Sequence, residues 1–283
     1  MPDFKEDLTV SQRDDDTVFR VHMEHANIHL GGHGHDGDLL IYRSTASVQE
    51  AQNASVWING QGGNMMLGGG GADGDIVMFP SDATISQDSF DEATVWIDAG
   101  DGNLMLGGNG RDGDIFLFPA GATISQSNHA AATIHLNGDA GDIVLRNADV
   151  AEEFSVAGGA TAAPGTVMRL DAAGDLVPTD SPMDRSVVGV VSGAGDYRPA
   201  IVMDRKPEST GRCAIALMGK VCVMVTGEGG PIRVGDLLTS SSTPGHAMRA
   251  ASPADAAGAV IGKALAVHDG PGAGTVAIMI ALQ

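Results

Sequence analysis

Residues 31–38 read GGHGHDGD and place His33, His35, Asp36 and Asp38 within eight positions. Imidazole nitrogens bind transition metals and carboxylate oxygens bind calcium, so these residue types could form a metal site. The same stretch also suits a polar turn, because glycine allows positive φ and aspartate accepts hydrogen bonds from backbone N–H groups. Both interpretations have to be weighed against the rest of the chain.

This stretch belongs to an internal repeat. LGGGGADGD from Leu67 and LGGNGRDGD from Leu106 superpose on it without a gap, and these two copies are 39 residues apart. Only the first copy carries histidines, so the geometry of the turn does not require them. Turn chemistry alone accounts for what all three copies share, which is the glycines and a pair of aspartates: Asp36 and Asp38, Asp73 and Asp75, Asp112 and Asp114.

A second motif accompanies the turns: ANIHL at Ala26, ASVWI at Ala54, ATVWI at Ala93 and ATIHL at Ala132. The motif has the alternation of a short strand. Such a row of rings could stack on sugars, and packing against a neighbouring strand is the alternative. The ring always occupies the fourth position: His29, Trp57, Trp96 and His135.

Each copy indicates a strand, a glycine turn, a strand, a second turn and a third strand, and helical periodicity is nearly absent from the chain. Residues 76–79 and 115–118 are apolar throughout, so both faces of these strands must be covered. Further coils of the same chain could supply the cover, or the equivalent strands of two other chains wound into a triangular prism. The sequence therefore predicts an all-β protein with a glycine-rich repetitive β-prism or β-helix shaft.

Three regions are expected: an acidic N-terminal segment over residues 1–25, the repetitive shaft over 26–150, and a compact β-barrel or β-sandwich domain over 151–283. Charge is divided unevenly between them. Residues 1–150 carry 6 basic and 23 acidic side chains (net −17), whereas residues 151–283 carry 10 and 13 (net −3). A total of −20 would repel nucleic acid, so that class of partner is not expected.

Motifs for secretion, membrane insertion and catalysis are missing from the sequence. The first residues are acidic and polar rather than basic and then apolar, and no apolar run approaches the roughly 18 residues of a membrane span. We therefore expect synthesis in the cytoplasm without a signal peptide. Because no nucleophile elbow, phosphate loop or cysteine zinc spacing is present, we expect neither enzyme activity nor a required cofactor.

The repeats run into NADVAEEF at residues 147–154, and PGTVMRL, VVGVVSGAG, VGDLL and IGKAL follow. In these features the chain resembles the trimeric fibre and spike proteins of phage tails and of phage-derived contractile injection systems. The resemblance implies a parallel homotrimer whose terminal domain sets the register of the chains or binds a surface. It implies a structural role in a virion or extracellular particle. The expected partners are other copies of the chain and other particle components, with a cell-surface receptor or glycan as a further candidate.

Two further resemblances imply metal sites in the turns. His33 and His35 resemble the His-x-His of trimeric fibre tips, in which three chains surround an iron ion with two imidazoles each. GGxGxD resembles the calcium-binding nonapeptide of secreted toxins, which would make the six turn aspartates ligands, although the copies here recur at 37 and 39 residues rather than nine. Three interpretations of the turns therefore remain open: a site for iron or another transition metal, a calcium site, and a turn that binds no metal. The alternative function is that of a monomeric, calcium-stabilised β-solenoid that binds surfaces.

Overall fold

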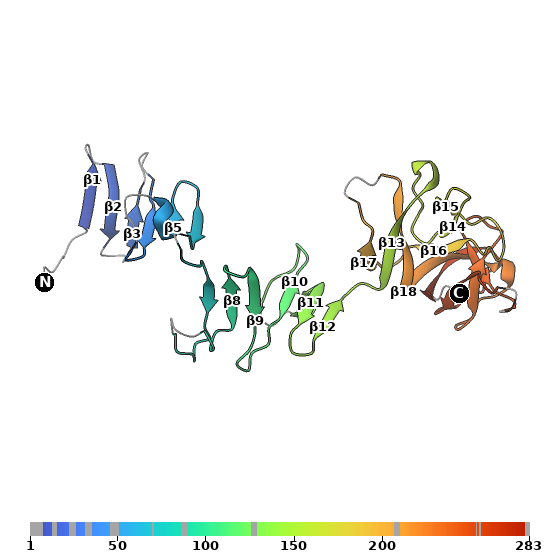
Figure 1. Ribbon diagram of the computed structural model, residues 1–283. Helices are drawn as coiled ribbons and strands as arrows, with labels where there is room; N and C mark the ends of the chain where they lie inside the picture. Colours follow the sequence, from blue (N-terminus) through green and yellow to red (C-terminus); the bar gives the residue numbers. More distant parts are fainter. Residues whose placement is uncertain are drawn as a thin grey trace. The chain divides into compact units, whose positions relative to one another are not determined.

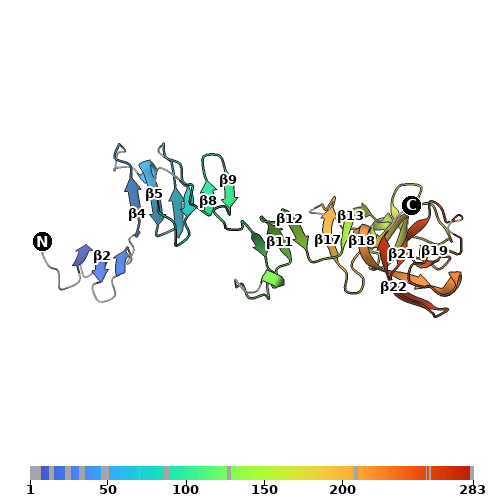
Figure 2. The same cartoon turned by 90° about the horizontal axis from the view of Figure 1, so that it is seen from below.

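The computed structural model describes residues 8–12, 16–22, 27–31, 36–45, 51–69, 71–85, 90–125, 129–206, 210–252, 254 and 256–280 (Figures 1 and 2). These residues form an all-β protein, as the sequence predicts. The described helical segments are four single turns of 3-10 helix: η1 (Ala51–Asn53), η2 (His129–Ala131), η3 (Ala157–Gly159) and η4 (Gly227–Gly229). No helix among the described residues is long and apolar enough to cross a membrane.

The repeats form small three-stranded sheets, each built from consecutive strands. Strands of three or four residues are typical of these sheets. The strands of the four sheets are β1 (Leu8–Gln12), β2 (Asp16–His22) and β3 (Asn27–Leu30); β4 (Leu39–Tyr42), β5 (Ala54–Asn59) and β6 (Asn64–Leu67); β7 (Ile76–Met78), β8 (Val95–Asp98) and β9 (Asn103–Leu106); and β10 (Ile115–Leu117), β11 (Ile134–Asn137) and β12 (Asp142–Leu145).

Antiparallel register separates two faces in these sheets. Trp57 lies opposite Leu40 and Met66, and Trp96 lies opposite Val77 and Met105. We call the side that bears the two indoles the ring face. Because side chains alternate along a strand, the remaining apolar residues share the opposite side, which we call the aliphatic face. Its members are Leu39, Ile41, Val56, Ile58, Met65 and Leu67 in the β4–β6 sheet and Ile76, Met78, Val95, Ile97, Leu104 and Leu106 in the β7–β9 sheet.

The glycine turns connect one sheet to the next and fold back on themselves. Gly108 and Arg111 exchange two backbone hydrogen bonds of 3.0 and 2.9 Å around Asn109 and Gly110. Both central residues have positive φ, 52° and 75°, which is the type I′ turn that Asn-Gly favours. The chain then returns so closely that a Cβ on Gly113 would lie 2.2 Å from the carbonyl oxygen of Leu106. Glycine is therefore required here by contact rather than by φ.

The equivalent glycine in the preceding copy gives a test of this geometry. A Cβ on Gly74 would lie 2.3 Å from the Leu67 oxygen, so Gly74→Ala should force the backbone apart and lower the free energy of unfolding by about 3 kcal/mol. Gly63→Ala is the matched control, because its Cβ meets no atom within 4 Å and only its positive φ opposes alanine, at about 1 kcal/mol. Denaturant unfolding at one protein concentration compares the two, and equal losses would contradict the close return of the turn.

A ten-stranded sheet makes up the C-terminal part of the chain. Part of it closes into a five-stranded barrel in the order β18, β20, β19, β21, β22, and pairing between β22 and β18 completes the ring. The barrel is one of the two architectures that the sequence predicts. The strands are β13 (Asp149–Ser155), β14 (Val167–Leu170), β15 (Leu176–Pro178), β16 (Val187–Val191), β17 (Pro199–Met203), β18 (Arg212–Thr226), β19 (Leu237–Ser240), β20 (Ala247–Arg249), β21 (Val260–Ala264) and β22 (Ala273–Ile280).

Nearly all buried apolar side chains belong to this C-terminal part. Val221, Val223 and Val225 of β18 point into the barrel together with Ile278 of β22. Among the described residues from 28 to 148, Ala54 is the only buried one. The packed apolar clusters of the described residues therefore lie in the C-terminal part of the chain.

Two compact units are distinguished by their internal contacts: Met1–Ile115 with Leu136–Asp142, and Phe116–His135 with Ile143–Gln283. β13 begins at Asp149 and pairs with both β17 and β18, so residues 149–155 belong to the C-terminal sheet. The domain limits predicted at residues 25 and 150 remain predictions.

Cys213 and Cys222 both lie in β18, and both are half-buried free thiols. Desolvation, with a further contribution from Glu153, raises the pKa of Cys213 to about 11. Desolvation and Asp196 raise the pKa of Cys222 as well. Both side chains are therefore unreactive thiols at neutral pH rather than a redox pair.

Candidate functional site

The second aspartate of each turn holds the strand that follows it. Asp38 accepts a hydrogen bond of 2.8 Å from Trp57 Nε1 through Oδ2, and one of 3.0 Å from the Gly60 backbone N–H through Oδ1. Each of its carboxylate oxygens therefore has a partner, one at the side chain and one at the end of β5. The carboxylate orients the indole and fixes the end of the strand.

The next copy repeats this arrangement. Asp75 accepts from Trp96 Nε1 at 3.0 Å and from the Ala99 N–H at 3.0 Å. In the third copy Asp114 accepts from the Gly138 N–H at 2.9 Å. The partners lie 22 to 24 residues further along the chain for the backbone bonds, so these aspartates organise a sheet rather than cap their own turn.

The first aspartate of each pair is placed differently from the second. Asp36, Asp73 and Asp112 are exposed, whereas Asp38, Asp75 and Asp114 are half-buried. Within the described ranges, no group of three or more His, Cys, Asp or Glu side chains could hold a metal ion. His33 and His35 lie outside the described residues. In the third copy the equivalent positions are Asn109 and Arg111, which belong to a two-residue turn rather than a strand.

Residues of the same chain partly cover the predicted ring row. Phe90 packs edge-on against Trp96 with 5.1 Å between ring centroids. Phe116 is stacked between His129 and His135 at 4.3 and 4.2 Å. Trp57, Trp96 and His135 are half-buried and His29 is exposed. The ring face is thus closed in part by aromatic contacts within one chain.

The aliphatic face has no comparable cover. Met65 is 60% exposed, Met78 52% and Leu104 56%, and in the last small sheet Leu117 and Ile143 are exposed too. The exposed side chains recur in equivalent positions of successive copies. Exposure of apolar side chains is therefore a feature of the repeat and is not confined to one residue. A monomeric soluble protein rarely exposes apolar side chains in so regular an array.

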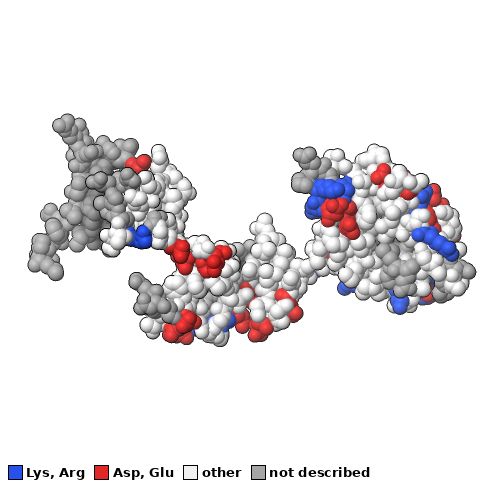
Figure 3. Space-filling model, viewed as in Figure 1, with Lys and Arg blue, Asp and Glu red and all other residues white. Residues whose placement is uncertain are grey.

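Acidic side chains are frequent in the same region (Figure 3). On the face shown, the charged side chains of the repeats are mostly Asp and Glu, whereas the C-terminal part presents both signs of charge. The exposed surface of a repeat therefore carries both apolar and acidic side chains.

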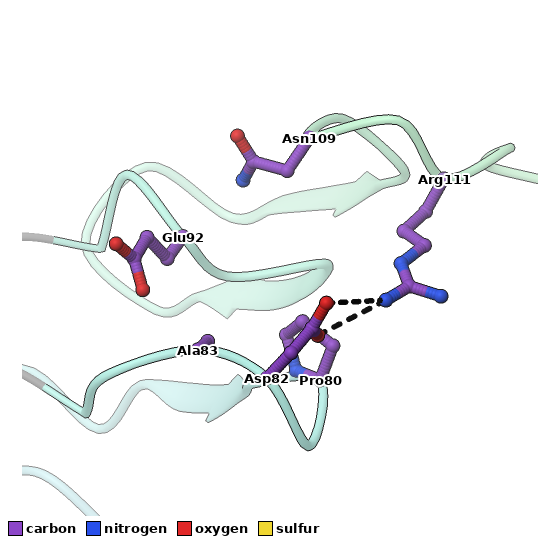
Figure 4. Close-up of a pocket in the computed structure, with 6 residues that line it drawn as sticks. All are labelled: Pro80, Asp82, Ala83, Glu92, Asn109 and Arg111. Carbon is purple, nitrogen blue, oxygen red and sulfur yellow. Dashed lines mark hydrogen bonds and ion pairs between the residues drawn. The ribbon is translucent and has the colours of Figure 1, made fainter.

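A small cavity of about 180 Å³ lies where the second copy meets the third (Figure 4). Pro80, Asp82 and Ala83 come from the loop after β7, Glu92 precedes β8, and Asn109 and Arg111 come from the glycine turn. Arg111 Nη2 donates to both carboxylate oxygens of Asp82, at 3.0 and 3.1 Å. The sequence analysis missed this cavity. The signal for it is that Asn109 and Arg111 replace the Gly70 and Ala72 of the preceding copy.

A buried carboxyl group marks the start of the C-terminal sheet. Asp149 is 2% exposed, and the Ser192 hydroxyl donates to its two oxygens at 2.9 and 2.8 Å. Desolvation raises the pKa of Asp149 and the hydrogen bond from Ser192 opposes that rise. Burial of the ionised form is therefore unfavourable despite the serine.

The raised pKa of Asp149 predicts a pH dependence of stability. A folded-state pKa above the unfolded value contributes stability below the unfolded pKa, and this contribution is lost as pH rises through the folded pKa. Asp149→Asn should therefore gain stability relative to the unchanged protein as pH rises from about 4 towards neutrality. Melting temperatures across that range measure the difference. Asp139→Asn, in an exposed turn, controls for loss of one charge, and parallel curves for Asp149→Asn and the unchanged protein would contradict the prediction.

No family model matches the sequence, and no curated protein matches it. Among solved structures, the chain is similar to the C-terminal fragment of bacteriophage phi29 gene product 12, with a TM-score of 0.33 and 13% identity over 47% of this chain and 100% of the fragment. It is also similar to pre-mature gene product 12 of the same phage, with the same score and identity, over 53% of this chain and 24% of that one. The structural neighbours are thus phage proteins, and at this TM-score neither match assigns a fold or a function.

Proposed function

We propose that the chain is a non-enzymatic structural protein that associates as a parallel homotrimer and forms a fibre of a phage tail or phage-tail-like particle. The repeats form the shaft, a β-prism or triple β-helix, and the C-terminal β-domain drives association. Synthesis takes place in the cytoplasm and the product resides in the virion or particle. Its partners are two further copies of the chain and other particle components, and one surface of the fibre contacts a cell.

The exposed aliphatic face is the observation that carries this proposal. Sheets of three strands with about four residues each are marginal on their own, and they need a second apolar layer to be stable. The copies of the repeat within one chain do not supply that layer, since Ala54 is the only buried residue among the described positions 28–148. Three-fold association brings the same face of each chain to a common axis and covers it with identical residues.

Association is also compatible with the acidic charge of this part of the chain. The N-terminal segment and the shaft together carry net −17 over residues 1–150, which keeps their outer surface hydrated, and like charges oppose the lateral addition of further copies. The apolar motifs between residues 164 and 265 that resemble phage fibre proteins agree with this function, which does not depend on them.

The alternative is a monomeric, calcium-stabilised β-solenoid that binds surfaces. It requires the turn aspartates as ligands. In the structure Asp38 and Asp75 have a different role. One carboxylate oxygen of each accepts a hydrogen bond from an indole N–H, and the other accepts from a backbone N–H. The exposed apolar face also stays unexplained if a single chain is the functional form.

Light scattering on the intact protein with a chelator present tests the proposal. The expected mass is three times 28.8 kDa, and it should not change when calcium is removed. A single-chain mass in dilute buffer would overturn the trimer. Dissociation or unfolding on chelation, reversed by calcium, would favour the alternative.

A further inference from the structure

The cavity at the junction of the second and third copies is lined mainly by polar groups that have hydrogen-bond partners within the chain. Arg111 donates to both oxygens of Asp82, and Glu92 Oε2 accepts from the Thr84 N–H at 2.7 Å. Asn109 Nδ2 donates to the backbone oxygen of Asp91. The Arg111–Asp82 pair is exposed, so these bonds orient the side chains and leave their polar atoms accessible to a ligand.

A second cavity of about 250 Å³ adjoins the first and shares Asn109 with it. Phe90, Trp96 and Met105 contribute to its wall. The indole of Trp96 cannot turn freely, because its N–H is bonded to Asp75 and its ring packs edge-on against Phe90. Asn109 therefore lies between a cavity with a polar lining and a cavity with an aromatic wall.

This pairing of surfaces fits one class of ligand. A sugar ring carries hydroxyl groups that both donate and accept, which suits carboxylate, amide and guanidinium groups together, and its C–H faces pack on aromatic rings. Two carboxylates and one guanidinium line the polar cavity, so an acidic sugar would be disfavoured. We propose that the two cavities form a binding site for a short neutral glycan, with one sugar ring in the polar cavity and a neighbouring one against Phe90 and Trp96.

The preceding junction differs from this one in the residues of its turn. At the preceding junction the turn carries Gly70 and Ala72, and Arg43 of the loop donates to the Gly71 backbone oxygen at 3.0 Å instead. Arg43 and Arg111 therefore both connect successive copies, but only Arg111 lines the cavity. This difference supplies a matched control for a purely structural role.

This inference rests on the proposed function, in which one surface of the fibre contacts a cell. It names neutral glycans as the class of ligand that this contact would recognise.

Saturation-transfer NMR on the intact protein tests the site. The probes are the methyl glycosides of glucose, galactose, mannose and N-acetylglucosamine, with lactose and diacetylchitobiose as disaccharides. We expect saturation to be transferred from the protein to at least one probe. The dissociation constant should be about millimolar for a monosaccharide and lower for a disaccharide. Arg111→Ala and Glu92→Gln should each weaken binding about tenfold or more, whereas Arg43→Ala should leave it unchanged.

Melting curves of each variant identify any loss of fold, and the conservative Glu92→Gln keeps a group that can accept from Thr84. No transfer to any probe at about 10 mM overturns the site, as does binding that survives both Arg111→Ala and Glu92→Gln. Scattering mass measured on the same samples separates the two proposals: a trimer that binds no sugar overturns the glycan site alone, and a monomer that binds sugar overturns the trimer alone.

Discussion

Replacing Leu104 by aspartate is expected to abolish trimer formation, although this side chain is 56% exposed in a single chain. Leu104 lies on the aliphatic face, opposite Ile97 in the β8–β9 pair. If the face is buried between chains, the substitution places three carboxylates in one apolar interior. Desolvation of each costs on the order of 5 kcal/mol, and the three repel one another.

The same substitution has the opposite consequence in a monomer. A charge at an exposed apolar position would leave stability nearly unchanged and improve solubility, because no interface is lost. Scattering mass and circular dichroism on Leu104→Asp therefore separate the two states. Gln61→Asp adds the same charge in an exposed turn and should keep the trimer. A Leu104→Asp protein with the mass and spectrum of the unchanged one would contradict burial of the aliphatic face.

Removing the C-terminal domain is expected to have the second large effect, which is loss of assembly by the repeats. The strands of successive copies are short and similar, so a slip of one copy exchanges near-equivalent side chains and the register is poorly specified. Bringing three chains together also carries an association cost that short strands repay slowly. The C-terminal part has the packed core and a nearly balanced charge, and we expect it to trimerise alone and set the register.

The structure determines where the chain can be divided for this experiment. Ala151 of β13 is fully buried and β13 pairs with β17 and β18, so a fragment that begins after β13 would lose a central strand. Residues 147–283 should form a folded trimer, whereas residues 1–146 should show neither a defined mass nor a cooperative melt. A folded monomer of 147–283 beside an unaided trimer of 1–146 would show that the shaft directs its own assembly.

Local sequence patterns were sufficient to predict the strands and turns of the repeat. Alternation in ASVWI predicted the strand at Ala54–Asn59, and Asn109-Gly110 has the composition of the type I′ turn found there. The partners of the aspartates were not predictable in this way. Asp75 accepts hydrogen bonds from Trp96 and Ala99, which lie 21 and 24 residues further along the chain, and no local spacing specifies these contacts.

Pairings between distant segments were equally inaccessible from the sequence. The apolar run at Arg212–Thr226 predicted a strand, but its pairing with Ala273–Ile280 closes a barrel that no local pattern distinguishes from a sandwich. The cavity lined by Asn109 and Arg111 was not predictable either, because the sequence shows only that these residues replace Gly70 and Ala72 of the preceding copy. Their contacts with Asp91 and Asp82 lie 18 and 29 residues away.

Methionine oxidation on the intact protein tests most directly whether other copies of the chain cover the aliphatic face. Met65 and Met78 lie on that face and are 60% and 52% exposed in a single chain, whereas Met183 is 40% exposed in the C-terminal part. Treatment with dilute peroxide followed by peptide mass spectrometry gives the three rates, with denatured protein as the reference for each peptide. The trimer predicts that Met65 and Met78 are oxidised several-fold more slowly than Met183. Rates for Met65 and Met78 that equal or exceed the rate for Met183 would show that the aliphatic face is open to solvent, which contradicts the trimer.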